Sequence, residues 1–330
     1  MRHSLKLKSF LLVMVTALVT VSCNIDDGAE TIPIPESTLA DLISADTNLS
    51  SLFAALERAD LVTTLQGNGP FTIFAPDNTA FSNFLGAAGF GSVNDVPVET
   101  LRQLLLNHVV TGSIEASLLI NLQRNYLETL ADGPTSDTKV ALYFDAVNGI
   151  SFNGISTVTS GDKPGSNGIY HIVDGVIALP TLATFIGVDE NFISFDTSLD
   201  LISPVSDLPD MLEESTGPFT LFIPIEHAFD NLLASNSDWD FLSDIDENFL
   251  NSVMNHHVLN GNLRSTSING GQTATTLEGD DITFVNLDGN LEITDGLGNE
   301  GAIIGFTDIQ ASNGVIHGIP NNVLLPDTTN

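Results

Sequence analysis

Histidine is the side chain in this sequence that is best suited to proton transfer or metal binding near neutral pH. Two of the seven histidines, His108 and His257, each take the last place of an i, i+3, i+4, i+7 stripe that is otherwise apolar. That spacing puts each imidazole on the buried face of a predicted helix, near its C-terminal end. We interpret both as buried hydrogen-bonding groups that tie the helix end to the next segment, with contact to a binding partner as the alternative.

The residues that precede these two histidines differ from each other. Asn107 stands before His108, whereas His256 stands before His257. Adjacent positions on a helix point about 100° apart, so His256 and His257 cannot converge on one ion. The pair therefore predicts no metal site.

The sequence also lacks the motifs of common enzyme classes. It has no Gly-x-Ser-x-Gly elbow, no phosphate-binding glycine loop and no His-Glu-x-x-His pair. Carboxylate pairs of the kind that glycosidases use must occur by chance among 42 acidic residues, so they identify nothing. We therefore predict a protein that is not an enzyme, with no catalytic residue, no cofactor and no metal site.

The single cysteine, Cys23, stands where an N-terminal leader would be cleaved. A basic start, residues 1–8, leads into an apolar run, residues 10–21, that is too short to span a membrane. This order resembles a bacterial lipoprotein signal, in which the cysteine is acylated and becomes the first residue of the mature chain. We expect a signal peptide at 1–22, lipidation of Cys23 and a tether at 23–35; an ordinary signal peptide is the alternative.

The mature chain is strongly acidic. Without residues 1–22 it keeps six basic residues against 42 acidic ones, a formal charge of −36 at pH 7. Such a surface repels nucleic acid and anionic lipid, so neither is an expected partner, and the membrane is contacted only through the lipid anchor. The acidic surface leaves loose binding of divalent cations as an open alternative.

We expect the protein in the cell envelope, as an outer-membrane lipoprotein exposed at the cell surface.

Several segments of this sequence repeat at a domain-sized spacing. Phe71–Pro76 (FTIFAP) returns as Phe219–Pro224 (FTLFIP), and the blocks that end in His171 and His317 match as well. The offset stays close to 150 residues, far above the roughly 20–50 residues of solenoid repeats. We therefore predict two homologous domains in tandem, and we interpret His171 and His317 as structural.

The two predicted domains span residues 36–181 and 190–327, so residues 181–190 leave little room for a flexible linker. Each domain begins with helical patterns and continues with hairpins, and this order predicts an α+β fold. Asn148-Gly149 and Asp288-Gly289 predict two-residue type I′ turns in these hairpins.

One helix start differs between the two domains. Asp77 is well placed to cap the helix that follows the first FTIFAP strand, whereas Ile225 stands at the same place in the second domain. An isoleucine side chain cannot accept a hydrogen bond from the free N–H groups of a helix start. We expect the second helix to begin without a side-chain cap.

Three ordered blocks, each found twice, carry a family resemblance. Residues 71–81 (FTIFAPDNTAF), 107–112 (NHVVTG) and 311–317 (ASNGVIH) are similar to the signature blocks of fasciclin-like (beta-Ig-H3/fasciclin) domains. The resemblance implies a wedge of β-strands packed with several helices, an extracellular location, and roles in adhesion or matrix contact without catalysis. The tyrosine that precedes the histidine in the family's receptor-contact motif is replaced by Asn107 and His256, which argues against transferring integrin-type binding.

These observations predict an adhesion or binding module at the cell surface, which contacts extracellular proteins or glycans weakly and at several points. One alternative is a structural spacer of the envelope or matrix without a specific ligand. Carbohydrate binding is the other, because exposed aromatic rings are the usual platform for sugars. Trp239, the single tryptophan, lies between two aspartates, and we interpret it as covering the edge of the core.

Overall fold

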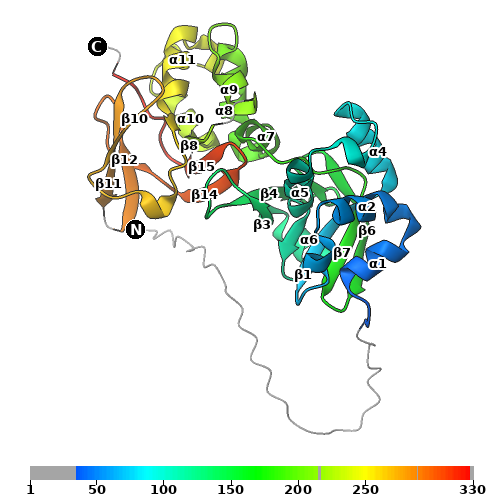
Figure 1. The fold of residues 1–330 in the computed structure, drawn as a ribbon. Helices are drawn as coiled ribbons and strands as arrows, with labels where there is room; N and C mark the ends of the chain where they lie inside the picture. The colour runs from blue at the N-terminus through cyan, green and yellow to red at the C-terminus, as the bar shows by residue number, and fades with distance from the viewer. Residues whose placement is uncertain (1–34, 215–216, 288, 328–330) are drawn as a thin grey trace, which may run out of the picture. The chain divides into compact units, whose positions relative to one another are not determined.

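The computed structural model describes residues 35–214, 217–287 and 289–327. The predicted signal peptide, the predicted lipidation site Cys23 and the predicted tether up to residue 34 lie outside these residues. The described chain contains two copies of one arrangement of helices and strands, the first drawn from blue to green and the second from green to red in Figure 1. The predicted α+β fold with two tandem domains is confirmed.

The first copy begins with helices and closes with a barrel. Its elements are α1 (Leu39–Ala45), η1 (Thr47–Leu49), α2 (Ser50–Arg58), α3 (Val62–Leu65), β1 (Phe71–Pro76), α4 (Asn78–Ala87), η2 (Val93–Asp95), α5 (Val98–Leu106), β2 (Val109–Thr111), α6 (Ala116–Leu122), β3 (Arg124–Asp132), β4 (Lys139–Asp145), β5 (Ser151–Phe152), β6 (Ser156–Gly165) and β7 (Gly168–Val173). Strands β1 to β7 pair with one another in numerical order. Strand β7 also pairs in parallel with β1, and this pairing closes the barrel.

Strand β1 is the centre of this copy because both of its faces are covered. Residues 72–76 are buried, which explains why the strand reads as an almost continuous apolar run. Phe74 packs with Phe144 and Phe152 on one face. Ile73, the next residue along the strand, packs into the core that the helices cover. Adjacent strand residues point to opposite faces, so one short strand joins two cores.

The second copy repeats most of these elements but leaves its sheet open. Its elements are α7 (Leu182–Val188), η3 (Glu190–Phe192), α8 (Ile193–Ile202), α9 (Leu208–Glu214), β8 (Phe219–Pro224), α10 (Glu226–Ala234), η4 (Leu242–Asp244), α11 (Glu247–His256), β9 (Val258–Asn260), η5 (Ser265–Ser267), β10 (Thr273–Thr275), β11 (Asp281–Leu287), β12 (Asn290–Thr294), β13 (Ala302–Ile303), β14 (Phe306–Ala311) and β15 (Gly314–Ile319). The strands form two sheets, in the orders β10-β11-β12-β13 and β14-β15-β8-β9.

The two sheets of the second copy are divided at two places, between β9 and β10, where a single bridge joins Leu259 and Thr276, and between β13 and β14. In the first copy the ten-residue strand β6 pairs with β5 at one end and with β7 at the other, so it joins the two halves of the barrel. In the second copy its place is taken by two short strands, of which β13 pairs with β12 and β14 pairs with β15. Ile304 and Gly305 separate these strands, and single backbone hydrogen bonds connect them to the two sheets there: the Ile304 amide donates to the Leu291 carbonyl at 2.9 Å, and the Gly305 amide donates to the Gly318 carbonyl at 2.8 Å.

The predicted difference between the two helix starts is confirmed. The Asp77 carboxylate accepts a hydrogen bond of 2.8 Å from the Ala80 amide at the start of α4. Ile225 at the start of α10 makes no side-chain cap. The rest of each helix is held by its buried face, with Phe81 in α4 and Phe229 in α10.

The short joint predicted at residues 181–190 is helical in the structure. It contains α7 and the start of η3, which repeat α1 and η1 of the first copy. Thr38 and Thr181 each form a capping box at the start of their helix. The structural match between the two copies therefore extends back to Thr181.

The type I′ turn predicted at Asn148-Gly149 is wrong. Asp145 of β4 pairs with Ser151 of β5, so a five-residue loop joins them, and of the two turn residues Gly149 alone has a positive φ, 109°. The Asp145 carboxylate accepts a hydrogen bond of 2.8 Å from the Val147 amide, which bends the chain before the predicted turn. In the second copy Leu287 pairs with Asn290 as a two-residue turn requires, but Asp288 lies outside the described residues.

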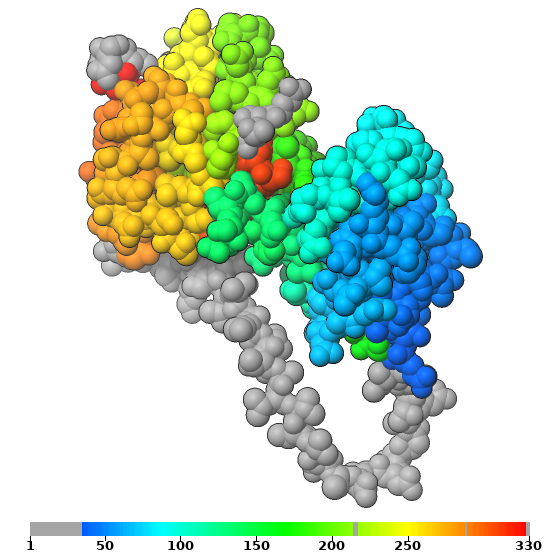
Figure 2. Space-filling model, viewed as in Figure 1, coloured from blue at the N-terminus to red at the C-terminus, as the bar shows by residue number. Residues whose placement is uncertain are grey.

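Contacts between described residues join the two copies. Strand β14 packs against β4, where orange-red and green atoms meet in Figure 2. The Tyr126 hydroxyl donates a hydrogen bond of 2.7 Å to the Asp189 carboxylate. Among the helices that the structure describes, none has the length and apolar character needed to cross a bilayer.

Candidate functional site

His108 lies just after α5 and is almost completely buried. Its Nε2 atom accepts a hydrogen bond of 2.9 Å from the Ile177 amide. The proton of the neutral ring must then sit on Nδ1, which donates to the Leu104 carbonyl at 2.8 Å. Both ring nitrogens are thus occupied by backbone groups from the helix and from the closing segment of the same copy.

His257 repeats this arrangement in the second copy. Nε2 accepts from the Leu324 amide at 2.9 Å, and Nδ1 donates to the Val253 carbonyl at 2.7 Å. Burial lowers the pKa of His257 to about 3 and that of His108 to about 4. Both rings therefore stay neutral near pH 7, and neither presents a free nitrogen to a ligand.

His171 on β7 is a second buried link in the first copy. Its Nδ1 atom accepts a hydrogen bond of 3.3 Å from the Asp162 amide, so Nε2 carries the proton and donates to the Ile114 carbonyl at 2.9 Å. The ring also stacks on Phe74, with ring centroids 5.7 Å apart. Burial lowers its pKa.

His317 on β15 makes the matching contacts in the second copy. It accepts from the Asp308 amide at 3.3 Å, donates to the Leu263 carbonyl at 2.8 Å, and stacks on Phe222 at 5.3 Å. Burial lowers its pKa as well. Each copy therefore uses two neutral histidines to connect loops that lie far apart in the sequence.

Asn107 and His256 occupy matching positions but have different partners. The Asn107 side-chain amide donates to the carbonyls of Ile177 and Ala178, both at 3.1 Å. His256 accepts a hydrogen bond of 3.1 Å from the Gly296 amide through Nε2. The asparagine therefore binds the closing segment, whereas the histidine binds the loop after β12.

His256 also has two acidic neighbours, Glu278 and Asp280, and ligand atoms of the three residues lie within 4.8 Å of one another. Because Nε2 accepts from the Gly296 amide, the ring proton sits on Nδ1, which faces a Glu278 oxygen 3.6 Å away. A proton in that position leaves His256 without a lone pair directed at an ion between the three residues. The arrangement favours a buried polar contact over a metal centre.

Trp239 follows α10 and is half-buried at the edge of the core. Its ring stacks on Phe249 of α11, with centroids 6.1 Å apart and an interplanar angle of 29°. Two residues later, Phe241 is 69% exposed. We considered Trp239 from the sequence but not Phe241. A comparison of the two copies marks the position of Phe241 as different, because Ser92 stands there in the first copy.

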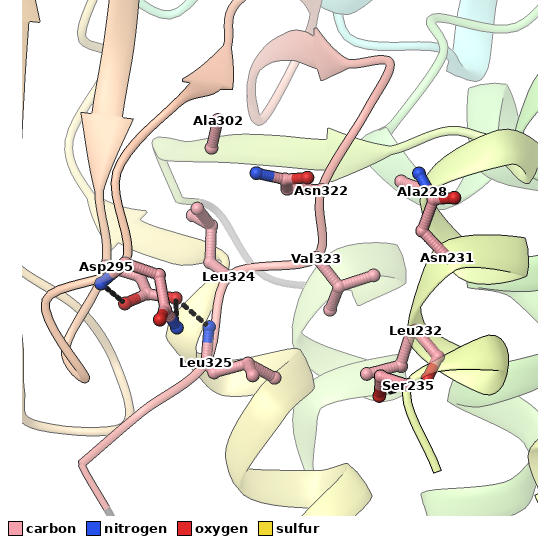
Figure 3. A pocket seen from close by; sticks show the side chains of 11 residues that line it. Ala228, Asn231, Leu232, Ser235, Asp295, Ala302, Asn322, Val323, Leu324 and Leu325 are labelled. Carbon is pink, nitrogen blue, oxygen red and sulfur yellow. Dashed lines mark hydrogen bonds between the residues drawn. The ribbon is translucent and has the colours of Figure 1, made fainter. Parts of the chain in front are cut away.

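The second copy also has a small pocket of about 220 Å³ between α10 and the closing segment (Figure 3). Its lining residues are Ala228, Asn231, Leu232, Ser235, Asp295, Asn299, Ala302, Asn322, Val323, Leu324 and Leu325. The Asp295 carboxylate accepts hydrogen bonds from the Asn299 amide at 2.8 Å, the Asn299 side chain at 3.0 Å and the Leu325 amide at 3.0 Å. These bonds fix the pocket wall and occupy its charged group.

The fold and these paired links define the class of the protein. The fasciclin domain model matches residues 47–180 and 194–326, and the chain belongs to this family. The FAS1 domain pair of the insect cell adhesion molecule fasciclin I has a similar fold, with a TM-score of 0.51 and 17% identity over 84% of this chain and 97% of that one.

Curated relatives include proteins from animals, a cyanobacterium and a fungus. Human periostin is 30% identical over 270 residues, which cover 80% of this chain and 29% of periostin. Porcine transforming growth factor-beta-induced protein ig-h3 is 27% identical over 266 residues, 80% of this chain and 36% of that protein. Protein sll1483 of Synechocystis sp. is 34% identical over 147 residues, 43% of this chain and 74% of the relative. The chain thus spans about a third of the length of the two animal relatives.

Proposed function

We propose that this chain is a non-enzymatic adhesion module that works outside the cell. The observation that carries the proposal is the tandem pair of fasciclin domains, the arrangement found in the cell adhesion molecule fasciclin I. Four buried histidines support the non-enzymatic part of this proposal. Backbone groups occupy the ring nitrogens of His108, His171, His257 and His317. An acid–base catalyst needs such a nitrogen within reach of a substrate.

The proposal includes lipid anchoring at Cys23 after removal of residues 1–22, a tether at 23–35, and exposure on the outer membrane. It rests on the order of basic, apolar and cysteine segments in the sequence. The change Cys23→Ser should move the protein from the membrane fraction to the soluble fraction. Unchanged membrane retention of this variant would contradict the anchor.

The partners that we propose are extracellular proteins or glycans, which the two domains contact weakly and together. Linking two weak sites can raise avidity by about 10²–10⁴ without a new contact. Divalent cations could bridge the acidic surface to a partner, since the mature chain carries a formal charge of −36.

Adhesion of protein-coated beads to cells or matrix tests this proposal. The mature chain should adhere better than chains that contain one domain, provided circular dichroism shows that the remaining domain is folded. Adhesion should also weaken when a chelator is added. If one domain adheres as well as the pair and the chelator has no effect, avidity and cation bridging are both wrong.

A further inference from the structure

The segment between α10 and α11 presents an aromatic side chain to solvent. Phe241 is 69% exposed, more than any other large apolar side chain in the described residues. Trp239 lies beside it in the chain and is half-buried against Phe249. We name residues 236–246 the acidic–aromatic loop, because four exposed aspartates share it with these rings: Asp238, Asp240, Asp244 and Asp246.

The acidic–aromatic loop has an ordered backbone. The Asp244 carboxylate accepts hydrogen bonds from the amides of Asp240 at 3.0 Å and Phe241 at 2.8 Å. Asp246 caps α11 by accepting from the amides of residues 248 and 249, both at 3.1 Å. The backbone at Phe241 is therefore held in place, and a partner that binds there meets little cost in ordering the loop.

The first copy shows that the fold does not need these side chains. The same turn and short helix are built there with Ser92 in place of Phe241, and with Gly89 and Gly91 in place of Asp238 and Asp240. Ser92 caps η2 through its side chain, whereas Phe241 makes no side-chain cap for η4. Phenylalanine at this position loses a cap and exposes an apolar ring, so its presence is explained better by binding than by stability.

The charge around the loop identifies the kind of partner. Residues 190–327 contain 23 acidic residues and a single basic one, Arg264. The Arg264 guanidinium lies 3.2 Å from the Asp308 carboxylate, on another part of the second copy. The loop therefore attracts cations, and the same field repels nucleic acid and anionic lipid.

We propose that the acidic–aromatic loop binds an arginine-bearing segment of an extracellular protein. A guanidinium stacks on an aromatic face and pairs with carboxylates at the same time, and Phe241 with its chain neighbours Asp238 and Asp240 offers both contacts. This inference rests on the proposed adhesive function and names the chemistry of its protein partner.

A fluorescein-labelled peptide with four arginines separated by glycines is the probe, and its anisotropy is measured with the full mature chain at low and moderate salt. We expect Phe241→Ser, which copies Ser92, to weaken binding about threefold. Asp238→Asn with Asp240→Asn should weaken it about fivefold, as expected for two exposed ion pairs. The same peptide with citrulline, a neutral analogue of arginine, should not bind.

Matched controls remove similar groups elsewhere. Ile120→Ser removes another exposed apolar side chain, and Asp137→Asn with Glu300→Gln removes two exposed charges. Each control should change the affinity for the peptide by less than about twofold. Thermal melts that match the wild type show that the loop variants are folded.

Three results would overturn the inference: no binding of the arginine peptide, equal binding of the citrulline peptide, or equal weakening by the control charges. The last result would mean that the peptide senses net charge alone. These outcomes are distinct from failure of the adhesive function, because in each of them the wild-type chain still adheres in the bead assay. If the wild-type chain does not adhere in the bead assay, the proposed adhesive function itself is wrong.

Discussion

The two copies share a chain path and their buried histidines, but they differ in sheet closure and in charge. The first copy closes seven strands into a barrel, whereas the eight described strands of the second copy, β8 to β15, form two sheets. The first copy, residues 36–181, has five basic residues, against one in residues 190–327. What is the same in both copies, the links of His108 and His257 for example, is what the fold requires. Positions that differ, such as Phe241 in one copy and Ser92 in the other, are not required by the fold, and their side chains are available to bind a partner.

The largest expected effect tests the difference in closure. Phe74 and Phe222 are fully buried at matching positions of the two copies. The ring centroids of Phe74 and Phe152 are 4.0 Å apart. Replacing either by alanine should cost about 3–5 kcal/mol. We expect Phe74→Ala to lie at the upper end, because a closed barrel relaxes less around a cavity than two sheets that only a few backbone hydrogen bonds connect.

Urea unfolding of both phenylalanine variants measures these costs. Phe241→Ala, at an exposed position, is the control and should stay within about 0.5 kcal/mol of wild type. A larger loss for Phe222→Ala than for Phe74→Ala would contradict the link between barrel closure and rigidity.

Next in size is the effect of the histidine links. His108→Ala and His257→Ala should each destabilise their copy by about 1–3 kcal/mol, because two buried backbone groups lose their partner. Thermal melts measure the loss, and His227→Ala, at an exposed position, serves as the control. Wild-type melting of both buried variants would show that these residues are not needed for the fold.

The pH dependence of stability separates the copies further. Burial lowers the pKa of His108 to about 4 and of His257 to about 3, whereas an unfolded histidine titrates near 6.5. The unfolded chain takes up these protons first, so their contribution is fully present above pH 6.5. It falls by about 1.4 kcal/mol per pH unit and per histidine below that value, down to pH 4 for His108 and to pH 3 for His257.

Urea unfolding between pH 7 and pH 4.5 of the wild type and of His257→Gln tests this linkage. The variant should lose less stability than the wild type over this range, since it lacks one of the groups that titrate. Carboxylates titrate in both proteins alike, so their effect cancels in the difference. Equal slopes would mean that His257 is not held neutral by burial.

The smallest predicted effect concerns the helix caps. Asp77→Ala should destabilise the first copy by about 1 kcal/mol, because the Ala80 amide loses its acceptor. Asp137→Ala, an exposed aspartate outside the helices, controls for the loss of charge. If both variants melt at the same temperature, the cap contributes nothing beyond its charge.

Local patterns in the sequence predicted much of this fold. The two FTIFAP-like strands, the α+β order and the capping difference between Asp77 and Ile225 depend on neighbouring residues, and all were correct. The turn at Asn148 was not, because the preceding Asp145 carboxylate changes the local geometry. Barrel closure depends on which distant strands pair, and no short segment contains that information.

The candidate sites show the same limit. His108 could be placed on a buried helix face from spacing alone, but its partner Ile177 lies 69 residues away. The neighbours of His256 and the walls of the pocket come from separate loops, so no motif marks them. Exposure of Phe241 is likewise a property of the folded chain.

The most direct test of the account measures adhesion and stability together in the double variant His108→Ala, His257→Ala. Bead adhesion is measured well below its melting temperature and divided by the folded fraction, beside wild type and the His227→Ala control. The account predicts a lower melting temperature and unchanged adhesion per folded molecule, because the two histidines hold the fold and contact no partner. Wild-type melting together with lost adhesion would contradict it.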